Sequence, residues 1–123
     1  MKLENIGLGI DVENVERFKK YTQKDNPFVN RIFTKKEIEY SYKTKNFAQH
    51  LCARYCAKEA CVKALYSLGV DGYFCRDFEV ENLPSGVPKI NLIGPKRGDN
   101  LNFKLSLSHT DTFAAATVIV VIN

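Results

Sequence analysis

The stretch FAQHLCARYCAKEACVKALYSL, at residues 47–68, predicts the longest helix of the chain. Its apolar side chains recur at helical spacing and are Phe47, Leu51, Tyr55, Val62 and Tyr66. Gly69 follows directly and is expected to cap the C-terminal end, because glycine readily adopts the left-handed conformation that ends many helices.

A strand is predicted near the start of the chain. Residues 6–12 (IGLGIDV) alternate between apolar side chains and Gly7, Gly9 and Asp11, which is the two-residue period of a strand. The face that carries the two glycines has little side-chain bulk, so another group can approach the backbone closely there.

Two shorter helices are predicted between this strand and the long helix. Asn14 is a suitable N-cap for the first of them. The apolar residues expected on that helix are Val15, Phe18 and Tyr21. Thr34 and Glu37 have the spacing of a capping box and predict a second helix that continues to about Lys43.

The second half of the chain has the pattern of strands. The predicted strands are residues 78–80, 88–92, 101–108 and 113–122, the last of them interpreted as a buried strand. Residues 108–112 are expected to form the turn that joins the last two. Helices early and hairpins late favour an α+β fold, with helices on one face of a mostly antiparallel sheet.

The composition fits a single domain over residues 1–123 and excludes several classes of protein. The longest apolar run, residues 113–122, has ten residues, whereas a membrane-spanning helix needs about 20. The charged residues near the start interrupt any secretory apolar core. The four cysteines lack metal-site spacing, and free thiols are expected. A cytoplasmic protein follows as the expectation.

Positive charge is concentrated in one part of the chain. Residues 17–63 hold twelve Lys or Arg against four Asp or Glu, although the whole chain carries only +4. A basic segment of this kind indicates an anionic partner, such as a phosphorylated cofactor, a nucleic acid or an acidic protein. The alternative is a solvated, lysine-rich helix face without a ligand.

The long helix carries the most suggestive charges. Glu59 and Lys63 are four residues apart, so they either form an ordinary surface ion pair of about 0.2–0.5 kcal/mol or belong to a site. Arg54 and Lys58 are also four apart and repel each other unless an anion lies between them. Three cations and a carboxylate on one helix suit a phosphate ester together with a divalent ion.

Other parts of the chain could complete such a site. Asp11, near the end of its strand, is the natural second metal ligand, and Glu13 points the same way in extended chain. The alternative for such an Asp is a turn or cap residue. His109, where a strand meets a turn, could bind phosphate, although a lone histidine is more often structural.

Several of these residues lie in motifs that occur together. In chain order they are GIDV at 9–12, ARYCAKEACVK at 53–63, GVP at 86–88, LSHT at 107–110 and AAA at 114–116. This combination resembles the 4′-phosphopantetheinyl transferases, specifically the short holo-[acyl-carrier-protein] synthase type, over essentially the whole chain. The resemblance implies the 4′-phosphopantetheinyl transferase fold. It also implies transfer of 4′-phosphopantetheine from coenzyme A to a carrier-protein serine, with Mg²⁺ and with release of adenosine 3′,5′-bisphosphate.

The resemblance also implies roles for individual residues. Asp11 and Glu59 would hold Mg²⁺, Glu59 would accept the serine proton through water, and Lys63 would neutralise the leaving group. The residues expected to contact coenzyme A are Arg54, Lys58, Lys63 and His109 at the phosphates, and Gly86 and Pro88 near the adenine. The order Asp-Val-Glu is similar to the larger transferases, which implies Glu13 as a possible third metal ligand.

The partners implied by the resemblance are an acidic acyl carrier protein and further copies of the chain. Arg17, Lys20 and Lys24 are the candidates for docking the carrier, and the short members of the family form homotrimers with active sites at subunit boundaries. Neither a nucleic acid nor a membrane is expected as a partner.

Two other functions use the same residues differently. A basic nucleic-acid-binding or nucleotide-binding module without catalysis would explain the positive segment and its interleaved tyrosines, but it has no need of Asp11 and Glu59. A metal-dependent phosphohydrolase would use these two acids, but the chain lacks the additional Asp and His ligands of a two-metal site.

Overall fold

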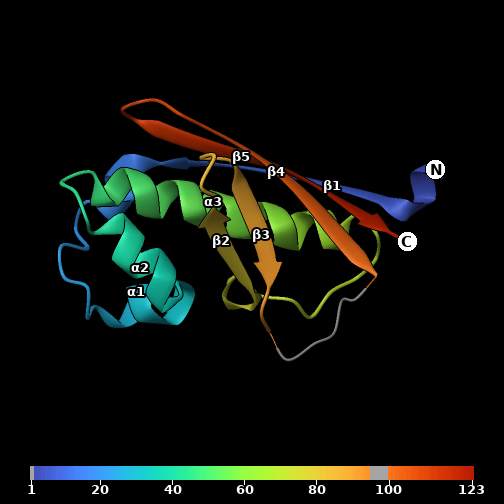
Figure 1. The fold of residues 1–123 in the computed structure, drawn as a ribbon, viewed down its shortest axis with the longest axis horizontal. Helices are drawn as coiled ribbons and strands as arrows, with labels where there is room; N and C mark the ends of the chain where they lie inside the picture. The colour runs from blue at the N-terminus through green and yellow to red at the C-terminus, as the bar shows by residue number, and fades with distance from the viewer. Residues whose placement is uncertain (1, 95–99) are drawn as a thin grey trace.

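A long helix lies along one face of an antiparallel sheet in the computed structural model, which describes residues 2–94 and 100–123 (Figure 1). The helix is α3, Phe47–Tyr66. The sheet has the order β1-β5-β4, and its strands are Ile6–Asn14 (β1), Leu101–His109 (β4) and Phe113–Ile122 (β5). The predicted α+β arrangement is therefore confirmed, and the strand pairs within the described residues are antiparallel.

The end of α3 has the cap that the sequence predicts. Gly69 takes a φ of +79°, and its N–H donates to the carbonyl of Tyr66 at 2.8 Å. The N–H of Val70 donates to the carbonyl of Leu65 at 3.0 Å. These two bonds satisfy carbonyls that a helix end leaves free, in the arrangement known as a Schellman motif.

The two glycines of β1 face α3. A Cβ added to Gly9 would overlap the backbone of Ala60 and Ala64, and one added to Gly7 would overlap the Ala64 carbonyl oxygen. The group that approaches the glycine face is therefore the helix backbone. The apolar side chains of β1 lie on the other face of the sheet, where Leu8, Ile10 and Val12 are 57–60% exposed.

The interpretation of residues 113–122 as a buried strand is only half correct. On β5, the side chains that face α3 are buried, and they are Ala114, Ala116, Val118 and Val120. Phe113 and Ile119 lie on the opposite face and are 50% and 40% exposed. The alternation of β5 thus continues the exposed apolar face that begins on β1.

The segment between β1 and α3 differs in part from the prediction. Asn14 caps a helical turn as expected, but that turn is a short 3₁₀ helix, η2 (Val15–Phe18), and does not include Tyr21. An unpredicted helix, α1 (Pro27–Ile32), follows, because the Asn26 side chain accepts from the N–H groups of its first turn.

The predicted capping box begins α2 (Lys35–Ser41). The Thr34 hydroxyl accepts from the Glu37 N–H, and the Glu37 carboxylate accepts from the Thr34 N–H at 2.9 Å. Figure 1 shows α1 and α2 gathered at the end of the molecule where α3 begins.

A second, two-stranded sheet packs beside α3. It consists of β2 (Phe78–Asn82) and β3 (Pro88–Leu92), and Gly86 makes the turn between them with a φ of +91°. Before β2 lies a 3₁₀ turn, η3 (Cys75–Asp77), and another, η1 (Leu3–Asn5), precedes β1. All four cysteines are free and buried. Among the described residues, no helix is both long and apolar enough to cross a membrane.

Candidate active site

Asp11 of β1 meets Lys63 of α3 where the glycine face brings the helix close to the strand. The Lys63 ammonium donates to Oδ1 of Asp11 at 3.0 Å and to the carbonyl of Ile10 at 3.1 Å. Asp11 is only 8% exposed, and its second oxygen, Oδ2, is buried with no hydrogen-bond partner. A buried carboxylate oxygen without a partner is costly, which makes this atom a candidate cation ligand.

Glu59 lies one turn before Lys63 on the same helix and is half-buried. Its Oε1 accepts a hydrogen bond from the thiol of Cys75 at 3.0 Å. Burial, together with the neighbouring Glu59 carboxylate, raises the pKa of the Cys75 thiol, so this thiol stays protonated at neutral pH. Sequence reasoning treated Cys75 only as an inert thiol, because nothing local indicates that η3 packs against this turn of α3.

The Lys63 ammonium is half-exposed and surrounded by acidic groups. Its hydrogen bond to Asp11 raises its pKa, and the charges of Asp11, Glu59 and Glu13 add to the effect against a smaller opposing contribution from burial. Lys63 therefore remains protonated at neutral pH, beside the carboxylates of Asp11 and Glu59. These three residues form the first group of the candidate site. A phosphate could contact the ammonium while a cation contacts the carboxylates.

The donor set fits one Mg²⁺ ion that keeps several waters. Mg²⁺ in phosphate-transfer sites usually takes one or two protein carboxylates, and Asp11 and Glu59 supply that number. No group of three or more His, Cys, Asp or Glu gathers as a metal site in the described part of the chain. Glu13, expected as a possible third ligand, instead accepts from the Arg17 guanidinium at 2.9 Å. The structure thus does not bring Glu13 into one ligand group with the other two.

The expectation that Lys58 contacts a phosphate is wrong. The Lys58 side chain has no exposure and forms an ion pair at 2.7 Å with Glu37 of α2, which is equally buried. Its ammonium also donates to three backbone carbonyls, those of Ile32, Cys75 and Phe78. The anion required between Arg54 and Lys58 is therefore the chain's own Glu37, whose charge also acts on Arg54.

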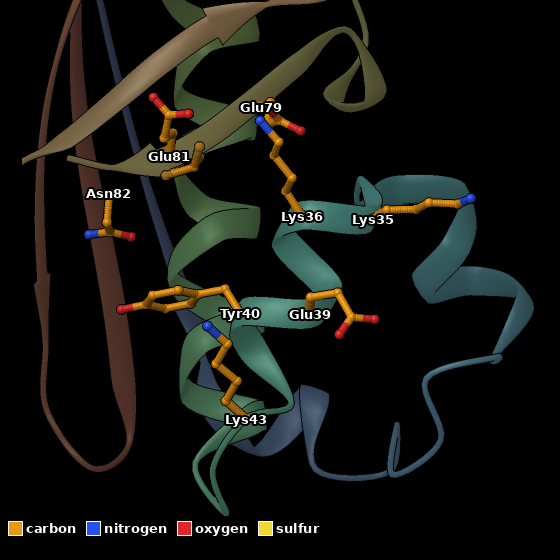
Figure 2. Close-up of a pocket in the computed structure, with 9 residues that line it drawn as sticks. Lys35, Lys36, Glu39, Tyr40, Lys43, Glu79, Glu81 and Asn82 are labelled. Carbon is orange, nitrogen blue, oxygen red and sulfur yellow. The ribbon is translucent and has the colours of Figure 1, made fainter. Parts of the chain in front are cut away.

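Arg54 belongs to a second group of residues, next to a pocket of about 360 Å³ between α2 and β2 (Figure 2). Its guanidinium donates to Oδ1 of Asn82 at 2.5 Å and lies 4.0 Å from the centre of the Tyr40 ring. Asn82 in turn donates to the carbonyl of Gly86 at 3.3 Å and pairs with Pro88 across the hairpin. Three of the predicted coenzyme A contacts are thus adjacent.

His109 joins this second group through His50. The His50 ring makes an edge contact with Tyr40, at 5.3 Å between ring centres. Burial lowers the pKa of His50, and the charges of Arg54 and His109 lower it further. His109 therefore lies within electrostatic range of the residues around Arg54.

Sequence reasoning missed Tyr40 and Asn82, because neither belongs to a motif and only the packing of α2 and β2 brings them to Arg54. In Figure 2, Tyr40 of α2 and Lys43, which follows α2, point toward the side of the pocket that carries Asn82.

The predicted docking residues follow β1 in the sequence, in and after η2. The Arg17 guanidinium lies 4.8 Å from the centre of the Tyr55 ring, in addition to its ion pair with Glu13. Lys20 and Lys24 are exposed, and Lys24 approaches Glu39 at 3.5 Å. Arg17 therefore lies against Tyr55 of α3, whereas Lys24 lies beside Glu39 of α2.

Known proteins share both the sequence and the fold of this chain. A model of the 4′-phosphopantetheinyl transferase superfamily matches residues 7–118. The holo-[acyl-carrier-protein] synthase of Thermodesulfovibrio yellowstonii is 36% identical over 115 residues, covering 93% of this chain and 96% of that protein. The enzyme of the same name from Clostridium botulinum is 39% identical over 118 residues, covering 93% and 95%. The crystal structure of a holo-(acyl-carrier-protein) synthase from Bacillus anthracis in complex with CoA (3′,5′-ADP) has a TM-score of 0.76 at 26% identity, covering 95% and 96%. The chain therefore belongs to the 4′-phosphopantetheinyl transferase superfamily.

Proposed function

We propose that this chain is a holo-[acyl-carrier-protein] synthase. It transfers 4′-phosphopantetheine from coenzyme A to a serine of an apo acyl carrier protein and releases adenosine 3′,5′-bisphosphate. The observation that carries the proposal is the buried, unpartnered Oδ2 of Asp11 beside the Lys63 ammonium. The names of the relatives and the bound CoA of the Bacillus anthracis enzyme support the same substrates.

The residues of the first group suit this reaction. Asp11 and Glu59 would hold Mg²⁺, which would neutralise charge on the pyrophosphate of coenzyme A. Glu59 takes the proton of the serine hydroxyl through a water molecule as the serine oxygen attacks the β-phosphorus. The bond from that phosphorus to the bridging oxygen breaks, and Lys63 neutralises or protonates the oxygen that leaves. The raised pKa of Lys63, which comes first from its hydrogen bond to Asp11, keeps the side chain positively charged and so favours neutralisation of the leaving oxygen.

The residues around Arg54 and those around Asp11 lie against different faces of α3. Arg54 and Lys63 are nine positions apart on α3, and at 100° per residue their side chains leave opposite faces of the helix. We therefore propose a homotrimer in which the second group of one subunit, around Arg54, completes the first group of its neighbour, around Asp11. The exposed apolar sheet face supports this, because monomers rarely expose such a surface.

The trimer predicts a specific effect of a charge on that face. Ile10→Glu is expected to give a monomer with native circular dichroism and at least about tenfold less transfer, because it would bury an unpaired carboxylate in the interface. Analytical ultracentrifugation measures the mass. Ile93→Glu, at an exposed apolar residue outside β1 and β5, is the control and should remain trimeric. A trimeric Ile10→Glu variant, or a monomeric wild-type protein, would refute this interface.

The transfer itself is tested by the intact mass of a purified apo carrier protein. Incubation with this protein, coenzyme A and Mg²⁺ should add one phosphopantetheine group to the carrier, and EDTA should prevent the addition. Fatty-acid, polyketide and peptide carriers are tested in parallel, since the Asp-Val-Glu order at residues 11–13 resembles the larger transferases that serve peptide and polyketide assembly lines. The absence of any mass gain with all three carriers would reject the proposed function.

The cations that follow β1 and the thiols support the remaining assignments. Arg17, Lys20 and Lys24 are suited to an acidic carrier protein that presents its serine to the first group. The four free, buried cysteines are typical of a reducing compartment, which supports a cytoplasmic location.

A further inference from the structure

Cys75 occupies a defined place beside the proposed catalytic carboxylate. Its sulfur lies 3.0 Å from Oε1 of Glu59, and the cysteine is 8% exposed. A protonated thiol donates one hydrogen bond and an ionised carboxylate can only accept, so the direction of this bond is fixed. The bond occupies one oxygen of Glu59 and leaves the other for a cation or a water molecule.

The core of the protein, and not Glu59, determines where this thiol lies. The Cys75 carbonyl accepts from the buried Lys58 ammonium at 3.3 Å, and Lys58 is itself held by its ion pair with Glu37. The Asp77 carboxylate accepts from the N–H of Phe74 at 2.8 Å and so closes the η3 turn that carries Cys75. The thiol is thereby a donor in a fixed position next to the flexible Glu59 side chain.

The Glu59 carboxylate needs such a donor to keep one orientation. A glutamate has three rotatable side-chain bonds, and a half-buried one without a partner samples several rotamers. Groups that hydrogen-bond to metal-ligating carboxylates orient them, and removal of such a partner typically lowers metal affinity or activity by about 10–100-fold.

We propose that Cys75 is a positioning residue, whose thiol holds the Glu59 carboxylate in the orientation that binds Mg²⁺ and receives the serine proton. This inference rests on the proposed function. It also gives the buried pair of Glu37 and Lys58 a use in the site, because that pair fixes the turn from which Cys75 donates.

The test compares donors at position 75 without turnover. Mn²⁺ is titrated into the protein with saturating coenzyme A and no carrier, and the free ion is measured by electron paramagnetic resonance. Cys75→Ala removes the donor and is expected to weaken Mn²⁺ binding about tenfold. Cys75→Ser keeps a donor and should bind within about threefold of wild type. Cys61→Ala removes another buried thiol and is the matched control, with unchanged Mn²⁺ affinity expected.

Thermal unfolding of all three variants separates positioning from packing. Cys75→Ala and Cys61→Ala should lose similar stability, while only the former loses Mn²⁺ affinity and requires more Mg²⁺ for transfer. Equal affinity in wild type and Cys75→Ala, or a serine variant as weak as the alanine variant, would overturn the inference. A wild-type protein that binds Mn²⁺ and coenzyme A but does not modify any carrier would instead reject the proposed function.

Discussion

Asp11→Asn is expected to lower the rate of phosphopantetheine transfer by at least about 100-fold without lowering the stability of the metal-free protein. The two effects separate because Asp11 has two oxygens in different situations. Oδ1 accepts from Lys63, and an asparagine carbonyl can do the same. Oδ2 is buried without a partner, and the half-exposed Lys63 ammonium on the other oxygen offsets only part of the cost of burying this charge until a further cation is bound.

The second part of this prediction, on stability, is tested by the free energy of unfolding. Without divalent ions, the asparagine variant should unfold at the same urea concentration as wild type or at a higher one, because a buried, half-satisfied carboxylate has been neutralised. With coenzyme A and Mg²⁺, wild type should gain stability and the variant should not. Asp25→Asn, at an exposed aspartate, is the control for both measurements. A variant that is clearly less stable without metal would identify Asp11 as a structural residue only.

The sequence predicts those features of this fold that depend on local interactions. Asn14, Thr34 and Gly69 each act within a few residues of their own position, so the caps they form are visible in the sequence. Helix α1 carries equally local signals, an N-cap at Asn26 and a proline at the first helical position. It could therefore have been predicted as well.

What the sequence does not determine is which face of an element meets the core. The alternation in β1 separates the glycines from Leu8 and Ile10, but either face could have been the buried one. The close approach of α3 decides it, because only the glycine face admits the helix backbone. The apolar side chains are then left outside, which the usual expectation for apolar residues would not suggest.

The same limit applies to the charges of α3. The spacing of Glu59 and Lys63 predicts their places one turn apart on α3, and the Lys63 ammonium contacts Asp11. Asp11 is expected at the end of its strand, but β1 continues to Asn14 and Asp11 lies inside it. Lys58 has the same kind of spacing from Arg54, yet its partner Glu37 comes from another helix, 21 positions earlier in the chain. A pairing of that range depends on how α2 packs, which no local pattern contains.

Lys58→Met provides the decisive test of this correction, with an expected loss of about 3–5 kcal/mol in the free energy of unfolding. The methionine fills most of the volume but leaves Glu37 buried without a counter-charge, and it removes the donor to the carbonyls of Ile32, Cys75 and Phe78. An additional Glu37→Gln substitution removes the uncompensated charge and should restore part of the loss.

A lysine that contacted a phosphate would behave in the opposite way. Its replacement would weaken coenzyme A binding. The free energy of unfolding would stay unchanged within the roughly 0.5 kcal/mol that is usual for surface substitutions. Lys35→Met, at an exposed lysine of α2, sets that baseline. A Lys58→Met variant as stable as Lys35→Met would restore the original assignment. A large loss of stability, partly recovered in the double variant, would establish that the cation next to the proposed catalytic Glu59 serves the core, and it would leave Lys63, Arg54 and His109 as the predicted contacts of the coenzyme A phosphates.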